Sequence, residues 1–575
     1  MSTKKNSILI FMLTACFLTD TNGQTYWITN TTIVNTATGK LQPGMNIEIT
    51  GDRIKQVIKY NAKIKIPDTI VEMSGTGKFI MPGMVDGHIH FFQSGSLYTR
   101  PDVLNLGKFY SYENDQQWIK DNFNDLMRRY LACGITTVID VGGPFNNYEI
   151  RKKLENDPIT PNAYVTGPLI STYQPDNLDK IDPPIIKVKN EEEARELVRK
   201  QLPYHPDFIK IWYIVLPGQP AEATLPIIKA TIEESHKNNL KVAVHATEYE
   251  TARLAVEAGC DILVHSIDDK IADPALLQLL KSKNITYIPT AIVASKYNEV
   301  FSQQHRISSH ELTYANPFML GTLTDLRHLP AKEIGFDYKM MTSRLKVPSK
   351  EDSTILTNLK LVSDAGINVV TGTDAGNIGT QHASSFFTEL LAMKEAGMSN
   401  AQILKAATIN AATGFGKEKE IGSIENGRLA NLLLLNKNPF QDLEAVNDFN
   451  VIINRGQWIQ KDTLIYNSPE MLVQEQLNGY NLRNIDAFVA PYSDSVELYQ
   501  FPDKLIGKGK NELYDTYKEM FTKLKNLHCQ VTSRMIEGNK IIDHESITGF
   551  GPKPITAIAI YTFEKGKIQK VHFIQ

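Results

Sequence analysis

Short apolar runs recur through the middle of the chain, and this repetition limits the possible folds more than any other feature. Amphipathic stretches, for example at residues 191–201 and 225–239, separate the runs. Buried parallel strands read as short apolar runs, and the crossover between two such strands needs a helix. Eight units of this kind predict an α/β domain, a (β/α)8 TIM barrel, with its active site at the carboxyl ends of the strands. The runs occupy residues 80–85, 136–141, 163–166, 208–212, 242–244, 262–264, 287–289 and 368–370.

Side chains that suit metal coordination stand where these runs end. His88 and His90 follow the first run, and they are two residues apart, so on a strand both can face one ion. His245 and His265 end two later runs, and Asp374 closes the segment that begins at residue 368. One buried histidine at a strand end is more often a hydrogen-bonded core residue. Four histidines and an aspartate at strand ends instead predict a metal site, with Zn²⁺ as the preferred ion.

Lys210 lies inside the apolar run 208–212, where a charged ammonium is costly to bury. Burial favours the uncharged amine, which can react with CO₂ to form a carbamate whose two oxygens can bridge two metals. The alternative is a lysine that is held by a neighbouring acid. The position favours the carbamate over this alternative.

Together, these segments resemble the amidohydrolase superfamily, specifically its imidazolonepropionase- and prolidase-like branch. The resemblance covers about residues 25–465. It rests on motifs at residues 81–90, 208–212, 244–246, 264–266, 371–376, 406–412 and 422–430. It implies a barrel that is inserted into a small β-sandwich.

The resemblance also implies a two-metal centre, because single-metal relatives lack the bridging lysine and this chain has Lys210 at the matching strand. The expected cofactor is Zn²⁺, two ions per chain, with other divalent metals left open. The implied metal ligands are His88, His90 and Asp374 for one ion, His245 and His265 for the other, and carboxylated Lys210 as the bridge.

Two residues are expected to act in catalysis. A bound metal lowers the pKa of its water to about 7, so hydroxide would attack a carbonyl carbon. Asp374 would take the proton as general base and return it to the leaving nitrogen. His382 stands eight residues further on, and it is expected either to contact the substrate or to be an exposed loop histidine.

The barrel is predicted at residues 83–419, and the segments on either side of it have a different sequence pattern. Residues 24–82 and 420–466 contain β-rich stretches that are punctuated by glycine, so they predict one composite β-sandwich. A polar insertion at residues 297–350 follows the seventh run. It is predicted to form either a lid or a dimer contact.

The segment 470–575 is long enough for a separate domain. Helical stretches at residues 470–479 and 510–524 precede strand-like text. From residue 486 it resembles the NTF2-like (SnoaL-like) superfamily, which implies an α+β cone around a pocket. Such domains often dimerise, so a homo-oligomer is expected. Asp543 and His544 are predicted to be a surface pair rather than part of the pocket.

The amino terminus predicts export. Lys4 and Lys5 precede an apolar run at residues 8–18 that is too short to span a bilayer, which is typical of a signal peptide at residues 1–23. Two forms of processing remain open. Cleavage after Gly23 would release the chain, whereas a lipobox ending at Cys16 would anchor it as a lipoprotein. The expected location is periplasmic or extracellular, with a membrane anchor possible only through Cys16.

Net charge excludes one class of partner. The formal charge of −3 supplies no basic field, so a nucleic-acid partner is not expected. The expected partner is a small-molecule substrate. The leading function is hydrolysis of an amide C–N bond in a dipeptide, as in a prolidase, or in a cyclic amide. Hydrolysis of an ester or lactone at the same site, or a catalytically retired binding module, are the alternatives.

Overall fold

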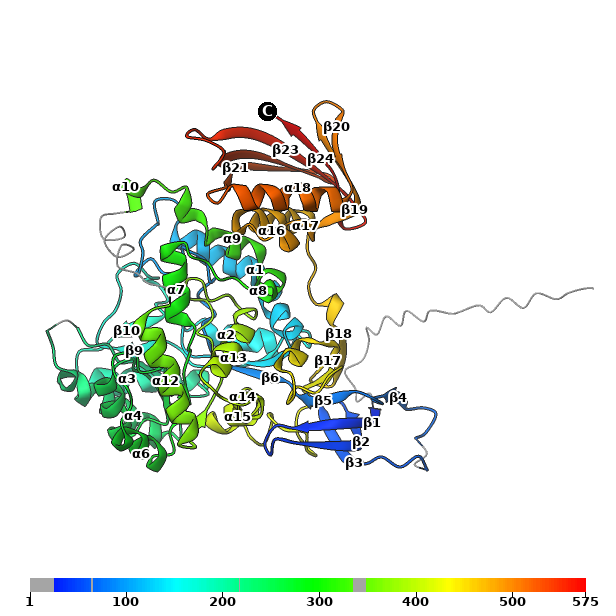
Figure 1. Cartoon of the computed structure of the whole chain (residues 1–575). Coiled ribbons are helices and arrows are strands. Elements are labelled where there is room, and N and C mark those ends of the chain that lie inside the picture. The colour runs from blue at the N-terminus through cyan, green and yellow to red at the C-terminus, as the bar shows by residue number, and fades with distance from the viewer. Residues whose placement is uncertain (1–24, 64–65, 217, 335–347) are drawn as a thin grey trace, which may run out of the picture.

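The computed structural model describes residues 25–63, 66–216, 218–334 and 348–575 (Figure 1). The signal peptide predicted at residues 1–23, with Cys16, lies outside the described residues. So do residues 335–347 of the insertion. Among the helices in the described ranges, none is long and apolar enough to cross a membrane.

Strands from both flanks pair into a single sheet. β16 pairs antiparallel with β5 and with β17, so the second flank continues the sheet that the first flank begins. The sheet curls until Ile54 N donates to Arg428 O (2.9 Å), and it encloses apolar side chains such as Ile28 and Leu432. Within the described residues the two flanks form one hydrogen-bonded sheet of eight strands. Its strands are β1 (Thr25–Asn35), β2 (Lys40–Thr50), β3 (Arg53–Lys59), β4 (Val71–Ser74), β5 (Phe79–Pro82), β16 (Leu432–Leu435), β17 (Phe449–Asn454) and β18 (Gln457–Gln460).

The middle of the chain carries short parallel strands in two sheets, of order β6-β7-β8 and β10-β9-β11-β12-β13-β14-β15. Every predicted apolar run contains a strand. Most of these strand residues are buried, which explains why the runs are continuous rather than alternating. The strands are β6 (Met84–Ile89), β7 (Ile135–Asp140), β8 (Asn162–Val165), β9 (Leu169–Ser171), β10 (Ile185–Lys187), β11 (Ile209–Trp212), β12 (Val242–His245), β13 (Ile262–Val264), β14 (Thr286–Ile288) and β15 (Asn368–Val369).

The run 80–85 does not form one strand. β5 ends at Pro82 in the curled sheet, and β6 begins at Met84 among the parallel strands. Gly83 permits this passage, because a Cβ atom there would lie 2.1 Å from Thr136 Oγ1. The prediction of strand structure at residues 80–85 is therefore confirmed, but the division of the run between two sheets depends on this close approach.

Backbone hydrogen bonds join the ends of the two parallel sheets. Asp374 N, after β15, donates to His88 O in β6 (2.7 Å). Asp207 N, before β11, donates to Val165 O in β8 (3.0 Å). Buried side chains from successive strands meet in one cluster, so the strands surround a common apolar centre. The cluster includes Val85, Ile139, Ala243, Val264 and Ile288.

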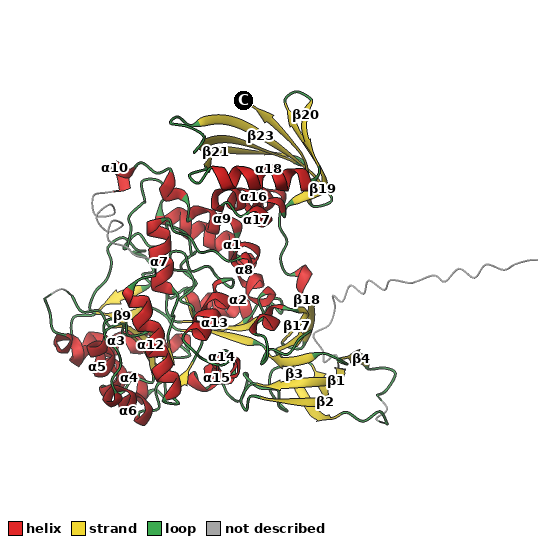
Figure 2. Cartoon of the chain, viewed as in Figure 1, coloured by secondary structure: helices red, strands yellow, loops and turns green. Residues whose placement is uncertain are grey.

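Helices cover the outside of these strands (Figure 2). Local signals set their ends: the Asn190 side chain accepts from Glu193 N at the start of α3, and Ser349 forms a capping box with Asp352 at the start of α12. The helices are α1 (Tyr112–Ala132), α2 (Asn147–Glu155), α3 (Glu191–Gln201), α4 (Leu225–Lys237), α5 (Tyr249–Glu257), α6 (Pro274–Ser282), α12 (Lys350–Asp364), α13 (Ser385–Glu395), α14 (Asn400–Ala406) and α15 (Ile409–Gly414).

The insertion is more regular than its polar sequence suggests. It carries α7 (Val293–Ser302), α8 (Ser309–Tyr314), α9 (Pro317–Thr322) and α10 (Ala331–Ile334). Buried Arg129 of α1 holds it in place, because its guanidinium pairs with Asp125 (2.7 Å) and donates to Ala315 O (2.9 Å). α9 packs against α16 (Pro469–Leu482) of the following domain, where Asn478 Nδ2 donates to Pro317 O (2.7 Å). The described part of the insertion therefore supports the C-terminal domain.

The C-terminal domain is an arched sheet over helices (Figure 1). The order β20-β19-β24-β23-β22-β21 is antiparallel except for the parallel pair β19 and β24. The prediction that Asp543 and His544 form a surface pair is wrong for Asp543, which is fully buried, whereas His544 is exposed. The Asp543 carboxylate makes a bidentate pair with Arg534 (2.7 Å for each bond). The elements are α16 (Pro469–Leu482), α17 (Ile485–Val489), β19 (Tyr492–Gln500), β20 (Lys504–Lys508), α18 (Lys510–Lys523), β21 (His528–Glu537), β22 (Lys540–Thr548), β23 (Ile555–Glu564) and β24 (Lys567–Ile574).

Candidate metal centre

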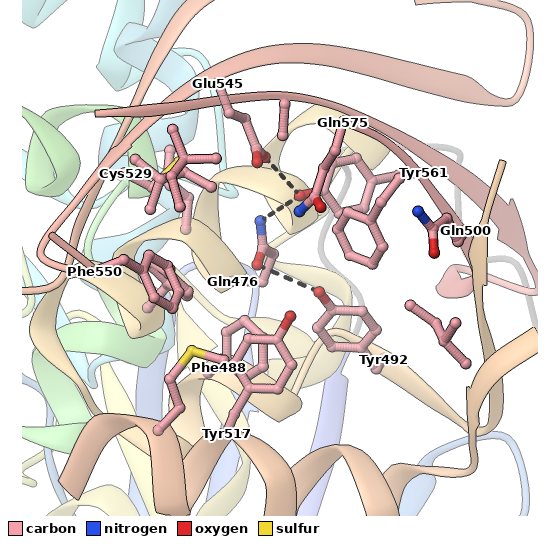
Figure 3. Close-up of a pocket in the computed structure, with 18 residues that line it drawn as sticks. Gln476, Phe488, Tyr492, Gln500, Tyr517, Cys529, Glu545, Phe550, Tyr561 and Gln575 are labelled. Atoms are coloured by element: carbon pink, nitrogen blue, oxygen red, sulfur yellow. Dashed lines mark hydrogen bonds between the residues drawn. The ribbon is translucent and has the colours of Figure 1, made fainter. Parts of the chain in front are cut away.

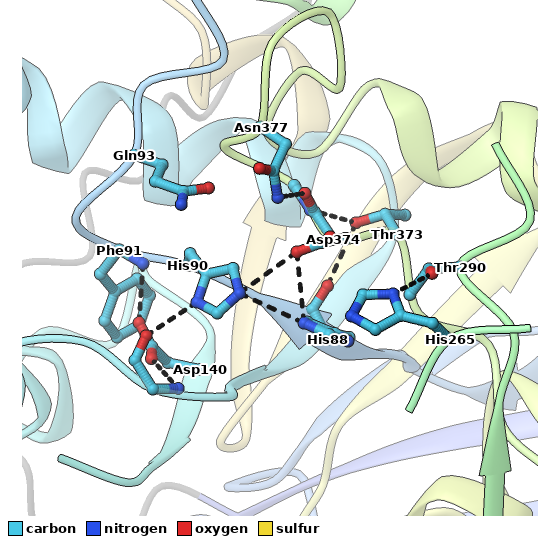
Figure 4. A network of polar contacts seen from close by, with 12 residues as sticks. His88, His90, Phe91, Gln93, Asp140, His265, Thr290, Thr373, Asp374 and Asn377 are labelled. Carbon is cyan, nitrogen blue, oxygen red and sulfur yellow. Dashed lines mark hydrogen bonds and ion pairs between the residues drawn. The ribbon is translucent and has the colours of Figure 1, made fainter. Parts of the chain in front are cut away.

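Three predicted ligands meet at the carboxyl end of β6 (Figure 4). His88 Nε2 and His90 Nε2 each lie 3.2 Å from Asp374 Oδ1, and the two nitrogens are 3.3 Å apart. All three side chains are buried, and their ligand atoms lie within 4.8 Å of one another. Asp374 reaches the histidines because the segment after β15 runs beside β6. This arrangement is compact enough to hold one metal ion.

The other two histidines lie next to this group. His245 ends β12 and His265 follows β13, and their ring centroids are 4.3 Å apart. The His265 ring centroid is 5.0 Å from that of His88. The parallel register of β12 and β13 brings both rings to the same end of the strands. Together they can offer ligands to a second ion.

Lys210 comes from β11, where it lies opposite Ala243 of β12. The side chain is buried, and no hydrogen-bond partner for Nζ occurs among the described residues. Burial lowers the pKa of Lys210 to about 7, although Asp374 acts in the opposite direction. A buried amine without a partner fits a site that another group completes, and the lowered pKa supplies the uncharged form.

The protonation states suit metal binding. Burial lowers the pKa of His88 to about 3, and it lowers the pKa of His245 and His265 well below the usual range. Neutral imidazole is the form that coordinates a metal. Burial alone would raise the pKa of Asp374, but His88 and His90 outweigh it and the pKa lies well below its usual range. The donor set therefore includes three neutral imidazoles and an ionised carboxylate.

Backbone contacts orient His90. Its Nδ1 lies 2.7 Å from Gly142 O, which can only accept a hydrogen bond. Nδ1 must therefore carry the hydrogen, and Nε2 keeps a free lone pair toward Asp374. The Asp140 carboxyl fixes the surrounding loops, because it accepts from Phe91 N (2.7 Å) and Gly142 N (2.9 Å). This arrangement selects the tautomer that a metal requires.

Asp86 connects the two segments that carry the first ligand group. Its carboxyl accepts from Thr373 Oγ1 (2.7 Å) and Thr373 N (3.1 Å), and more weakly from His88 N (3.3 Å). Burial raises the pKa of Asp86 to about 7. Sequence reasoning assigned Asp86 no role, although it stands two residues before His88. Its partner Thr373 is 287 residues away.

A second set of contacts supports the Asp374 loop. Asn377 Nδ2 donates to Asp374 O (3.1 Å), and Asn377 Oδ1 accepts from Arg100 (2.6 Å) and Tyr297 (2.7 Å). Asp374 itself has a φ of +59°, a left-handed conformation that needs such support. Arg100 is also paired with Asp102 through two bonds. Sequence reasoning missed these residues because none ends an apolar run.

The loop after β14 holds His265. Thr290 Oγ1 lies 2.7 Å from His265 Nδ1. The buried Glu389 carboxyl accepts from Ala291 N (2.9 Å) and Ile292 N (3.1 Å) directly after Thr290. Burial raises the pKa of Glu389 to about 8, against the effect of these two N–H groups. Glu389 thus positions the loop that orients a predicted ligand.

His382 is placed differently from the expectation. It is buried rather than exposed, and its ring nitrogens are both engaged: Nε2 with Gln93 O (2.7 Å) and Nδ1 with the Tyr130 hydroxyl (2.9 Å). Burial lowers its pKa to about 4. It lies outside the set of side chains that line the cavity at the metal centre. These contacts give His382 a positioning role within the loop rather than a contact with substrate.

A cavity of about 140 Å³ opens onto the centre. His90, Lys210, His245, His265 and Asp374 line it. Its remaining wall is mainly apolar. That wall is formed by Phe92, Leu169, Leu178, Ile185, Trp212 and Ile214, with Gln93, Arg100 and Asn377 as the polar residues.

Comparison with known proteins agrees with this geometry. The sequence model of the Amidohydrolase family matches residues 79–459, and that of the SnoaL-like domain matches residues 473–571. An imidazolonepropionase of Shouchella clausii (strain KSM-K16) is 34% identical over 104 residues, 18% of this chain and 22% of that protein. An imidazolonepropionase of Geobacillus kaustophilus (strain HTA426) is 31% identical over 106 residues, 18% of this chain and 25% of that protein. The match thus spans about a quarter of these curated relatives.

Solved structures share the fold over most of the chain. A putative prolidase from Bifidobacterium longum superposes with a TM-score of 0.57 and 22% identity, covering 77% of this chain and 98% of that one. A Xaa-Pro dipeptidase with bound methionine in its active site superposes with a TM-score of 0.57 and 21% identity, covering 76% of this chain and 100% of that one. The ochratoxinase of A. niger superposes with a TM-score of 0.56 and 19% identity, covering 76% of this chain and 96% of that one. At these identities the likeness concerns the fold.

Proposed function

Because the chain belongs to the amidohydrolase family, we propose that it is a metal-dependent hydrolase that cleaves an amide C–N bond of a small substrate. One observation carries the proposal. Neutral imidazoles, an ionised carboxylate and an unpaired lysine amine converge on a single cavity. The prolidase and dipeptidase names of the structural neighbours agree with a C–N bond as the target.

We infer that the parallel strands close into a (β/α)8 barrel. The hydrogen bonds that join β15 to β6 and β8 to β11, and the shared apolar centre, support this inference. In such a barrel the catalytic groups lie at the carboxyl ends of the strands, as these ligands do.

The residues present fit two divalent metal ions, of which Zn²⁺ suits imidazole and carboxylate best. One ion would be held by His88, His90 and Asp374, the other by His245 and His265. When bound, the metal supplies Lewis-acid chemistry, polarising a carbonyl and lowering the pKa of a coordinated water to about 7. Lys210 would bridge the ions as a carbamate: its Nζ bonds to the carbon of CO₂ and releases one proton.

The side chains of the site would then carry out the following steps. Asp374, held by His88 O and Asn377, accepts a proton from the attacking water and passes it to the leaving nitrogen. The new C–O bond forms as the C–N bond breaks, giving an acid and an amine. Trp212 and Ile185 hold the apolar part of the substrate and exclude bulk water.

The cavity favours a short substrate with an apolar group beside the scissile bond. Its volume of about 140 Å³ is below the range of drug-sized pockets, so it favours a substrate smaller than a drug-sized molecule. A dipeptide of the Xaa-Pro type, or a cyclic amide, meets this description.

The test combines metal content with hydrolysis. Elemental mass spectrometry on the wild-type chain is expected to give close to two metals per chain. The metal content of Lys210→Ala should fall sharply. Lys200 is an exposed lysine on α3, and the metal content of Lys200→Ala should equal that of the wild type. Labelling with ¹³CO₂ should give a carbamate signal in the wild type that Lys210→Ala lacks.

The activity arm uses a panel of Xaa-Pro dipeptides, other dipeptides and cyclic amides on the metal-loaded chain. Hydrolysis of at least one member, with loss in Asp374→Asn, supports the proposal. One metal in both the wild type and Lys210→Ala would indicate a mononuclear centre with a structural lysine. A chain that binds metal but hydrolyses no amide would refute the proposed reaction.

We also propose that the chain is exported and forms a homo-oligomer. The charged, apolar and polar order of residues 1–23 supports export, and the SnoaL-like domain supports self-association. Amino-terminal sequencing of the mature chain distinguishes cleavage after Gly23 from lipid attachment at Cys16. Light scattering measures the oligomeric state.

A further inference from the structure

The C-terminal domain contains a cavity of its own, far larger than the one at the metal centre. Its volume is about 330 Å³, within the range of small-molecule sites. It lies between α16–α18 and the concave face of the arched sheet (Figure 3). All of its lining residues belong to the segment 476–575, so it is separate from the metal centre.

Aromatic side chains are seven of the eighteen that line the cavity. The rings of Phe488 and Tyr517 lie 4.4 Å apart between centroids, and that of Tyr480 lies 6.1 Å from Phe488. Tyr492 and Tyr561 complete this part of the wall. Aromatic faces bind apolar groups, and they also attract cations through the ring quadrupole.

A directed chain of hydrogen bonds crosses the cavity and ends on an acid. The Tyr492 hydroxyl donates to Gln476 Oε1 (3.3 Å), and Gln476 Nε2 donates to the Tyr561 hydroxyl (3.1 Å). The Tyr561 hydroxyl then donates to Glu545 Oε1 (3.2 Å). Glu545 is 6% exposed, and within the described part of the chain no side chain or backbone group bonds its second oxygen, Oε2. A buried acceptor is therefore left for a ligand.

The charge around the cavity selects the ligand. Among the side chains that line the cavity, Glu545 is acidic, and none is a lysine, arginine or histidine. The neighbouring Arg534 is held by Asp543 in a bidentate pair, so it is not free to neutralise Glu545. Burial and Asp543 raise the pKa of Glu545 to about 7. A cation would stabilise the ionised carboxylate, whereas an anion would meet no opposite charge.

We propose that this cavity is a second ligand site, which binds a small organic amine. The ammonium group donates to Glu545 Oε2, and the apolar body of the amine lies against Tyr480, Phe488 and Tyr517. The chain of Tyr492, Gln476 and Tyr561 holds the carboxylate in place without using Oε2. The site is independent of the hydrolytic reaction, because it shares no residue with the metal centre.

Calorimetric titration of the full chain tests the proposal with matched probes. The amines are benzylamine, 2-phenylethylamine and cyclohexylamine, and each is compared with its carboxylate counterpart, namely benzoate, phenylacetate and cyclohexanecarboxylate. At least one amine should bind saturably, and its counterpart should bind at least about tenfold more weakly. This comparison on the wild-type chain needs no variant. It overturns the proposal if no amine binds more tightly than its counterpart.

Variants locate the bound amine. Glu545→Gln keeps an oxygen for the Tyr561 hydroxyl but removes the charge, so amine affinity should fall at least about tenfold. Glu537→Gln, an exposed glutamate at the end of β21, is the matched control and should bind as the wild type does. Asp374→Asn should also bind normally, which excludes binding at the metal centre.

A cavity-filling variant gives an independent result. Ala557 lines the cavity from β23 and is buried, so Ala557→Phe places a ring where the ligand would lie. Loss of amine binding in a variant that still shows a cooperative unfolding transition supports the site. Unchanged binding in either Ala557→Phe or Glu545→Gln would overturn it.

Discussion

Gly372 provides a way to disturb the proposed metal centre without replacing any of its proposed ligands. It lies between β15 and Asp374, packed directly against His88. A Cβ atom at residue 372 would lie 2.5 Å from Ile288 Cγ2, 2.9 Å from His88 Cβ and 3.0 Å from His88 N. We therefore predict that Gly372→Ala weakens metal binding through the backbone.

The structure sets the size of the effect. Carbon atoms in favourable contact are about 3.5–4.0 Å apart, so the new methyl must displace its neighbours by roughly 0.5–1 Å. His88 cannot retreat easily, since its carbonyl accepts from Asp374 N at 2.7 Å. Overpacking of this kind costs about 1–3 kcal/mol of unfolding free energy. Metal sites tolerate ligand shifts of only about 0.2 Å, so metal content should fall as well.

Two measurements check this prediction. Elemental mass spectrometry gives metal per chain, and chemical denaturation of the metal-free chain gives the free energy of unfolding. Gly551→Ala is the control, because a Cβ atom there meets nothing within 4 Å. If Gly372→Ala matched Gly551→Ala and the wild type in both quantities, the close approach of the two strands would not be what positions His88.

Three further predictions concern buried groups. The raised pKa of Glu389 means that its contribution to stability is present below pH 4.5 and is lost as the pH rises through about 8. Denaturation between these pH values should therefore show the wild type losing up to about 5 kcal/mol relative to Glu389→Gln, and parallel pH profiles would contradict this. Arg129→Met removes the charged partner of Asp125, which keeps its hydrogen bond from the Asn316 amide, so the free energy of unfolding should fall by about 3 kcal/mol, against less than about 0.5 kcal/mol for Lys120→Met on the exposed face of the same helix. His382→Ala leaves a buried hydroxyl and a buried carbonyl without their partner, which should cost about 1–3 kcal/mol at unchanged metal content. Loss of kcat at wild-type stability would instead indicate that His382 contacts the substrate.

The proposed ligands could be named from the sequence because each one stands at the end of a local apolar pattern or within it. A short apolar run predicts a parallel strand, and the residue at its carboxyl end faces the active-site end of the sheet. His245 and His265 are recognisable in this way without any knowledge of their neighbours. The family resemblance, now confirmed by the match at residues 79–459, supports the same reading.

The supporting residues could not be found in this way. Asp86 is 287 residues from Thr373, and Arg100 is 277 residues from Asn377. The local sequence around each of these residues does not indicate its partner, because such contacts depend on how two loops approach one another. His382 illustrates the same limit. Its position eight residues after Asp374 predicts either substrate contact or an exposed loop histidine, whereas packing directs its ring to Gln93 and Tyr130.

The sequence by itself determined the eight apolar runs that contain strands and the residues at their ends, because periodicity is a property of neighbouring residues. It did not indicate β9, β10 or the helices α7–α10. Only the tertiary structure decided the division at Gly83, the support of the C-terminal domain by α9, and the cavity that ends on Glu545. These features arise where segments far apart in the chain pack against each other, and their energies depend on distances that no local pattern encodes.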